Sequence, residues 1–249
     1  MKKLRPTLFL PAFFLPAFVL STFIAKTQDC SQYLLLQQNK TIEMSIYDKK
    51  GEPDGRKVYS VSNVSSSGGA TTGTVNTQLF DKKEKSLASS TCTMKCTGGV
   101  FLADLRLSLP PQQAGRTVNA TVTGDGFVEY PSGMKAGDTL KRATMILSGS
   151  GPGAAPPSGP PGPPAPPNPF APGNVTVAIF ERKVLGPDTV TTAAGHWNCI
   201  KISFKSKVSF KVGPFPTNIN IDGIEWYAPG VGIIKSQTDH GSTAITSIK

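Results

Sequence analysis

The sequence predicts an all-β protein, built as a curved antiparallel sheet or barrel of about twelve strands in meander order. Apolar and polar residues alternate in short segments along most of the chain, and a period of two is typical of half-buried strands. Turn-forming Gly, Asp, Lys and Ser residues separate these segments, which favours hairpins between sequential strands. After the N-terminal segment, no stretch carries the apolar period of a long helix.

The N-terminal segment has the order of a secretory signal peptide. A basic start, residues 1–5, precedes an apolar run from Leu8 to Ala25, and small or polar residues follow. We expect cleavage between Ala25 and Asp29, so that residues 1–28 are a signal peptide. The protein is then exported, to the periplasm or the extracellular side of the cell envelope.

Two other interpretations of this segment remain open. A retained transmembrane anchor is one, because the run approaches the roughly 20 residues that a spanning helix needs. Pro11 and Pro16 interrupt the run, and only Lys26 follows it as a basic residue, so we expect no transmembrane span in the mature chain. A lipoprotein is the other, with Cys30 acylated, but Asp29 stands where such a site expects a small residue.

The mature chain is expected to form a single β domain, residues 29–249. Its 221 residues (249 minus 28) suffice for a sizeable core. Four basic residues leave with the signal peptide, so the formal net charge falls from +10 to +6. The remaining bases are scattered and lack interleaved stacking aromatics, so no nucleic-acid partner is expected.

The first expected strand, Thr41 to Tyr47, shows the alternation clearly, with Ile42, Met44 and Ile46 on one face. Asp48 and Asp81 each begin an Asp-Lys-Lys turn, which indicates recurring hairpin chemistry. The further strands are expected at residues 56–64, 72–80, 86–96, 100–105, 117–123, 143–148, 175–184, 189–192, 197–210, 215–221, 224–226, 233–234 and 243–248.

Residues 149–173 interrupt this pattern and carry 11 of the 22 prolines. Proline cannot donate to a sheet ladder and favours the extended polyproline II conformation. The segment is therefore interpreted as a disordered loop inserted between two strands. A docking or spacer motif is the alternative.

All four cysteines, Cys30, Cys92, Cys96 and Cys199, are disulfide candidates in an exported chain. If Cys92 and Cys96 share a strand, their Cα atoms lie about 13 Å apart, which exceeds the reach of a bridge. Cys30 and Cys199 would then pair with one of them each, if they pair at all. Two free thiols are also compatible with the sequence.

Near the C-terminus, Trp226 and Tyr227 precede a Pro229-Gly230 turn, which predicts a hairpin. Aromatic side chains bury large areas, so we expect Trp197, Trp226 and Tyr227 to line the core or a cavity wall.

The sequence predicts no catalytic, metal or cofactor site. The two histidines, His196 and His240, lack a nucleophile-elbow sequence nearby. Cys92 and Cys96 do not combine with them at the spacing of structural zinc sites. The acids in turns match no calcium-loop motif. We therefore expect that the protein is not an enzyme and carries no cofactor.

Several motifs occur together in one order along the chain: Asp29-Cys30, Tyr47-Asp48-Lys49-Lys50-Gly51, Lys135-Ala136-Gly137-Asp138-Thr139-Leu140, Thr192-Ala193-Ala194-Gly195-His196-Trp197-Asn198-Cys199 and Glu225-Trp226-Tyr227-Ala228-Pro229-Gly230-Val231-Gly232. In these motifs the chain resembles the TapB family, exported β-rich proteins of Gram-negative bacteria. The resemblance implies a curved antiparallel sheet or barrel in the cell envelope and no catalytic residues. Ala193 departs from the family's usual proline, and Cys92 and the Pro-rich segment are additional.

Two functions fit these expectations. The first is a non-catalytic binding module, in which the strands enclose an apolar cavity for a lipid or another hydrophobic ligand. The second is a structural or protein-interaction protein with a solid core and no small-molecule ligand. An interior that is either hollow or filled would distinguish them.

Overall fold

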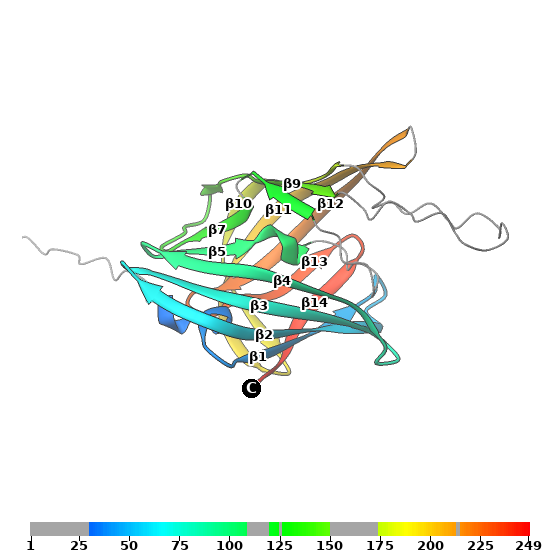
Figure 1. Ribbon diagram of the computed structural model, residues 1–249. Coiled ribbons are helices and arrows are strands. Elements are labelled where there is room, and N and C mark those ends of the chain that lie inside the picture. The colour runs from blue at the N-terminus through cyan, green and yellow to red at the C-terminus, as the bar shows by residue number, and fades with distance from the viewer. Residues whose placement is uncertain (1–29, 109–119, 125, 150–173, 213–214) are drawn as a thin grey trace, which may run out of the picture.

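The computed structural model describes residues 30–108, 120–124, 126–149, 174–212 and 215–249, and these residues form one antiparallel sheet of fourteen strands (Figure 1). The strands are β1 Thr41–Tyr47, β2 Pro53–Ser67, β3 Ala70–Asp81, β4 Ser86–Thr97, β5 Val100–Asp104, β6 Ala120–Thr123, β7 Phe127–Pro131, β8 Thr139–Leu140, β9 Ala143–Gly149, β10 Asn174–Thr192, β11 Gly195–Val212, β12 Phe215–Ala228, β13 Gly232–Thr238 and β14 Gly241–Ile248. The predicted all-β class and curved antiparallel sheet are confirmed. The signal peptide and nearly all of the Pro-rich segment fall outside these residues.

The strand order joins two meanders through the first and last strands of the chain. It runs β6-β9-β10-β11-β12-β13-β14-β1-β2-β3-β4-β5-β7, and β8 pairs with β10. β1 lies between β2 and β14, with Ile42 opposite Tyr59 on one side and Ile248 on the other. The first and last strands therefore lie side by side in the middle of the sheet.

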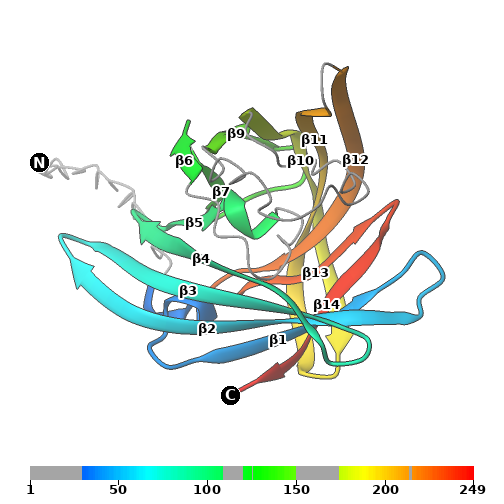
Figure 2. The ribbon, with the colours of Figure 1, turned by 45° about the vertical axis from the view of Figure 1, so that its right-hand side comes forward.

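The sheet curls until its two outer ends approach each other, which makes it a nearly closed barrel (Figure 2). The backbone N–H of Gly126, directly before β7, donates to the carbonyl of Thr144 on β9 at 3.4 Å. Long twisted sheets commonly close or split, because the twist accumulates from strand to strand.

β10 and β12 are each continuous where the sequence predicted two strands. In β10 the register shifts between Phe180 and Lys183 and again between Val184 and Gly186. Such bulges let a strand absorb an extra residue, and here they carry it past Gly186 and Pro187. The predicted interruption between residues 184 and 189 is therefore wrong, because the bulges carry β10 through these residues as one strand.

The two Asp-Lys-Lys turns are built alike. In each turn, one carboxylate oxygen of Asp48 or Asp81 accepts the backbone N–H groups two and four residues further on, at 2.8 and 2.9 Å. This side chain replaces backbone partners in the hairpin loop, which is why aspartate suits the position.

Three short 3-10 helices complete the described secondary structure: η1 Cys30–Gln32, η2 Leu34–Leu36 and η3 Leu105–Ser108. Between the first two, Tyr33 is completely buried. A disulfide joins Cys30 to Cys96 on β4, with a Cα–Cα distance of 5.5 Å. Cys92 and Cys199 are free and buried. Burial raises the pKa of Cys92 to about 12 and that of Cys199 to about 11.

Removing the disulfide should destabilise the fold. The bridge closes a loop of 66 residues, so a Cys30→Ala, Cys96→Ala variant should lose about 2–4 kcal/mol of unfolding free energy. Urea unfolding of the oxidised protein and the variant measures this loss. Thiol titration in denaturant should find two free thiols without reductant and four with it. Four thiols before reduction, or equal stabilities, would contradict the assignment.

Candidate functional site

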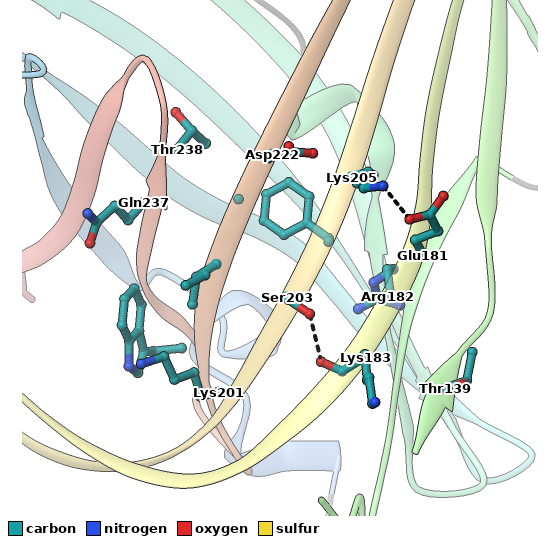
Figure 3. Close-up of a pocket in the computed structure, with 14 residues that line it drawn as sticks. Thr139, Glu181, Arg182, Lys183, Lys201, Ser203, Lys205, Asp222, Gln237 and Thr238 are labelled. Carbon is teal, nitrogen blue, oxygen red and sulfur yellow. Dashed lines mark hydrogen bonds and ion pairs between the residues drawn. The ribbon is translucent and has the colours of Figure 1, made fainter. Parts of the chain in front are cut away.

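A groove of about 770 Å³ crosses four neighbouring strands, β10 to β13 (Figure 3). It lies at the level where β13 leaves β12, because Gly223 and Thr238, the last residues that pair these strands, both line it. Its lining comprises Thr139, Glu181, Arg182, Lys183, Lys201, Ser203, Phe204, Lys205, Asp222, Gly223, Ile224, Trp226, Gln237 and Thr238.

Most of these residues lie on the sheet face opposite the core. On β11, Lys201, Ser203 and Lys205 alternate with the buried Ile202 and Ser206. Their cross-strand partners on β12 are, in the same order, Trp226, Ile224 and Asp222. Directly paired residues share a face, so the sequence pattern places three polar side chains opposite one aromatic, one aliphatic and one acidic residue.

Phe204 and Gly223 form the next pair in this ladder and belong to the core face by alternation. A Cβ atom on Gly223 would come within 2.4 Å of the Phe204 ring. The ring therefore lies directly over the glycine, which leaves apolar surface at the point where β12 and β13 diverge.

Trp226 lies in the wall of the groove and is only 7 % exposed. The ammonium groups of Lys201 and Lys235 lie over its ring, 5.2 and 4.9 Å from the ring centroid. The indole N–H donates to the Asp188 carboxylate at 2.9 Å, and this bond lowers the pKa of Asp188. Lys201 lies 3.7 Å from the same carboxylate.

The groove also carries charged side chains from β10. Lys205 makes an ion pair of 2.6 Å with Glu181, whose hydrogen bond raises the pKa of the lysine (Figure 3). The Ser203 hydroxyl donates to the backbone carbonyl of Lys183 at 3.4 Å. Among the described residues, the Lys183 ammonium has no ion-pair partner, so its charge is available to a ligand.

Behind the groove, four aromatic rings fill the interior of the barrel. Tyr33 stacks on Phe101 with ring centroids 4.3 Å apart, and Tyr130 stacks on Tyr227 at 4.7 Å. The hydroxyl groups of Tyr33 and Tyr227 share a hydrogen bond of 2.6 Å. Burial raises the pKa of both tyrosines, so they stay neutral.

A buried ion pair lies beside these rings. One Arg182 nitrogen, Nη2, donates to the Glu225 carboxylate at 3.2 Å, and Nη1 donates to the backbone carbonyl of Glu129 on β7 at 2.9 Å. The Tyr130 hydroxyl donates to Glu225 at 2.9 Å, and its ring lies 4.8 Å from the guanidinium carbon. Burial, and then the Glu225 charge, raise the pKa of Tyr130. This cluster connects β7, β10 and β12.

The three predicted aromatic residues occupy different places. Trp226 lines the groove, and Tyr227 points to the opposite side, into the interior, where it is completely buried. Trp197 is partly buried and does not line the groove. Its indole N–H donates to the Thr192 hydroxyl at 3.1 Å. Arg182 and Glu225 were not predicted as site residues from the sequence. Their positions among buried apolar residues of alternating strands were the available signal.

The histidines lie apart from the groove. The His196 ring pairs with the Thr191 hydroxyl at 2.8 Å, and His240 lies 3.5 Å from Asp239. In the described part of the chain, no group of three or more His, Cys, Asp or Glu residues could hold a metal ion.

Comparison with protein families matches the chain to the DUF3108-like family over residues 37–150 and 171–248. The chain belongs to the DUF3108-like family. A search among curated proteins gives no match. No helix in the described ranges of this DUF3108-like chain is long and apolar enough to span a membrane.

Two solved structures share the fold. One is an inferred exported protein of Bacteroides fragilis with a YmcC-like fold, 21% identical, with a TM-score of 0.64 over 86% of this chain and 96% of that one. The other is an inferred lipoprotein of Parabacteroides distasonis, 18% identical, with a TM-score of 0.66 over 89% of this chain and 100% of that one. At these identities, the likeness concerns the fold of the DUF3108-like chain.

The buried ion pair should couple strongly. Arg182→Met leaves Glu225 buried without its partner, so we expect a loss of about 3–5 kcal/mol in unfolding free energy. The double variant Arg182→Met, Glu225→Leu should lose less unfolding free energy than the two single variants together, with a coupling of about 0.5–3 kcal/mol. Urea unfolding of all four proteins measures it. The exposed pair Lys205–Glu181 is the control, and Lys205→Met should cost under about 1 kcal/mol. Additive effects at Arg182 and Glu225 would contradict the coupling.

Trp226 should contribute more to stability than Trp197. Its side chain is 7 % exposed and its N–H is hydrogen-bonded, so Trp226→Ala should cost about 3–5 kcal/mol. Trp197→Ala, at a partly buried position, should cost less. Thermal and urea unfolding compare the two variants. A loss below about 1 kcal/mol for Trp226→Ala would mean that the ring belongs to a solvent-facing binding surface.

Proposed function

We propose that the protein is a non-catalytic binding module of the cell envelope, and that the groove across β10–β13 holds a hydrophobic ligand, such as a lipid. The groove itself carries the proposal. Its volume of about 770 Å³ lies within the range of roughly 300–1,000 Å³ that is common for ligand sites.

The lining suits an amphiphilic molecule. Ile224 and Trp226 supply apolar surface on the groove face, whose removal from water by a ligand is favourable at about 25 cal/mol per Å². Lys183 and Lys201 line the same groove and could orient a polar or anionic end. The barrel wall holds these residues on rigid strands, which limits the ordering cost of binding.

The envelope location rests on the sequence and is supported by two further observations. A basic start and an apolar run precede the β domain, as in exported proteins. The Cys30–Cys96 disulfide suits an oxidising compartment. Of the two solved structures with this fold, the Bacteroides fragilis protein is inferred to be exported and the Parabacteroides distasonis protein is inferred to be a lipoprotein. Membership of the TapB family and the exact compartment are part of this proposal.

We propose binding without catalysis, because the hydroxyl of Ser203 and the carboxylate of Glu181, a possible nucleophile and a possible base in the groove, already have structural partners. The Ser203 hydroxyl donates to a backbone carbonyl, and the Glu181 carboxylate pairs with Lys205. Catalysis needs a base within hydrogen-bond reach of a nucleophile, and the described lining offers no such pair.

One observation favours the alternative, a structural or protein-interaction protein with a solid core. The stacked rings of Tyr33, Phe101, Tyr130 and Tyr227 and the buried Arg182 occupy the interior where a cavity was expected. We therefore place the ligand in the groove and not in the centre of the barrel.

The proposal predicts that lipid binds in contact with the Trp226 wall. Purified mature protein should yield lipid on solvent extraction and mass spectrometry. After delipidation, a dibrominated stearate should quench the emission of Trp226 in a Trp197→Phe background. Ile224→Glu should weaken binding by at least about tenfold, since a charge in an apolar contact is costly.

The matched control is Leu87→Glu, which adds the same charge at an exposed apolar position on β4. It should leave binding unchanged. An empty extract together with no quenching by the brominated lipid would refute the ligand and favour the interaction protein.

A further inference from the structure

The first half of β12 is an open sheet edge. β11 pairs with β12 along nearly its whole length, from Val212 opposite Phe215 to Ile200 opposite Tyr227. On the other side, β13 begins to pair only at Gly223. Residues 215–222 therefore have no described strand beside them on that side, and the β11–β12 ribbon rises beyond the β13–β14 hairpin (Figures 1 and 2).

This open edge also has uncovered apolar side chains. Phe215 is 71 % exposed and Ile219 is 39 % exposed, and they are two of the four large exposed hydrophobic residues in the described chain. The register of β11 and β12 has no shift between residues 215 and 227, so both lie on the same sheet face as the buried Glu225 and Tyr227. The sheet face that packs on the core in the second half of β12 is therefore exposed in the first half.

Natural proteins usually protect such edges with charges, prolines, bulges or covering elements. Pro216 stands near the start of this edge and Asp222 at its end, but residues 217–221 carry no charge or proline. The edge strand β7 is partly protected. Arg182 donates to the carbonyl of Glu129 on β7, and the N–H of Gly126, directly before β7, donates to a carbonyl of β9. The β12 edge therefore keeps its capacity to pair.

We propose that the edge of β12 at residues 215–222 docks an extended polypeptide segment of a partner protein, which joins the sheet as an additional strand. Unpaired backbone N–H and C=O groups require a partner that presents the same groups in the same repeat, and an extended polypeptide does. Apolar side chains at every second position of that segment cover Phe215 and Ile219. This proposal does not depend on a ligand in the groove.

The size of the edge argues for a peptide and against a second copy of this chain. Stable interfaces between folded proteins use about 20–30 residues on each side, whereas this edge offers eight. A flexible segment can bind through a short edge by main-chain hydrogen bonds and alternate side chains. The chain's own Pro-rich residues 149–173 are poor candidates, because each of their 11 prolines lacks the N–H that a ladder needs.

The charges on the sheet face opposite Phe215 and Ile219 indicate which polar residues the partner segment carries. Lys207 and Lys205 pair across the ladder with Asn220 and Asp222. Lys205 already binds Glu181, but Lys207 has no ion pair with any described residue. The partner segment is therefore expected to alternate apolar residues with polar or acidic ones, so that an acid lies near Lys207.

The test uses a fluorescein-labelled, capped peptide of about eight residues that alternates Val with Glu and Thr. Fluorescence anisotropy with the mature protein should show saturable binding, and hydrogen exchange should show new protection of backbone amides in residues 215–222. Ile219→Lys should weaken binding by at least about tenfold, because a charge on the apolar face opposes strand addition. Leu87→Lys, at a residue of similar exposure on β4, should not affect it.

Several results would overturn the proposal: no peptide binding, equal loss in both variants, or protection outside residues 215–222. Sedimentation that shows a dimer lost in Ile219→Lys would identify a second copy as the occupant instead. A peptide in which proline replaces every Val should not bind. The groove variant Ile224→Glu should keep its peptide affinity, so that failure of the lipid proposal and failure of this one are distinguishable.

Discussion

The buried pair of Arg182 and Glu225 holds together a sheet that backbone pairing alone leaves unjoined. The strand path ends at β6 and β7, and among the described residues the Gly126 N–H, directly before β7, is the backbone group that bonds to β9, the neighbour of β6. Arg182 reaches from β10 to a carbonyl of β7 and to a carboxylate of β12 in one side chain. A guanidinium offers five donors in a fixed plane, which makes it suitable for joining elements that lack a common ladder. The stacked tyrosines exclude water around this charge.

β12 performs two roles along one uninterrupted strand. Its second half lies between β11 and β13 and supplies Glu225 and Tyr227 to the interior and Trp226 to the groove. Its first half repeats the same alternation, but β13 has turned away to form its hairpin with β14. The groove lies between these halves, at Gly223 and Thr238. One strand divergence thus produces both the groove and the open edge.

Much of the fold is local and was predictable, while the site is not local. The alternation of Ile42, Met44 and their neighbours, and the Asp48 and Asp81 turns, depend only on adjacent residues, and the structure contains them as expected. The bulges of β10 depend on its pairing with β11, so the sequence alone indicated two separate strands there. Arg182 and Glu225 lie 43 positions apart, and a single sequence does not show that they meet. The curvature that opens the groove likewise comes from the whole sheet.

The Tyr33–Tyr227 contact has a consequence for how the chain reaches this structure. Its two residues are 194 positions apart, and the neighbouring β1–β14 ladder joins the first strand to the last. Synthesis proceeds from the N-terminus, so β1–β4 exist long before the strand that completes their interior. Folding rates fall as contacting residues become more distant in sequence. Until the later strands are available, the first strands expose apolar surface that those strands will cover. We therefore expect slow folding that depends on chaperones during this interval.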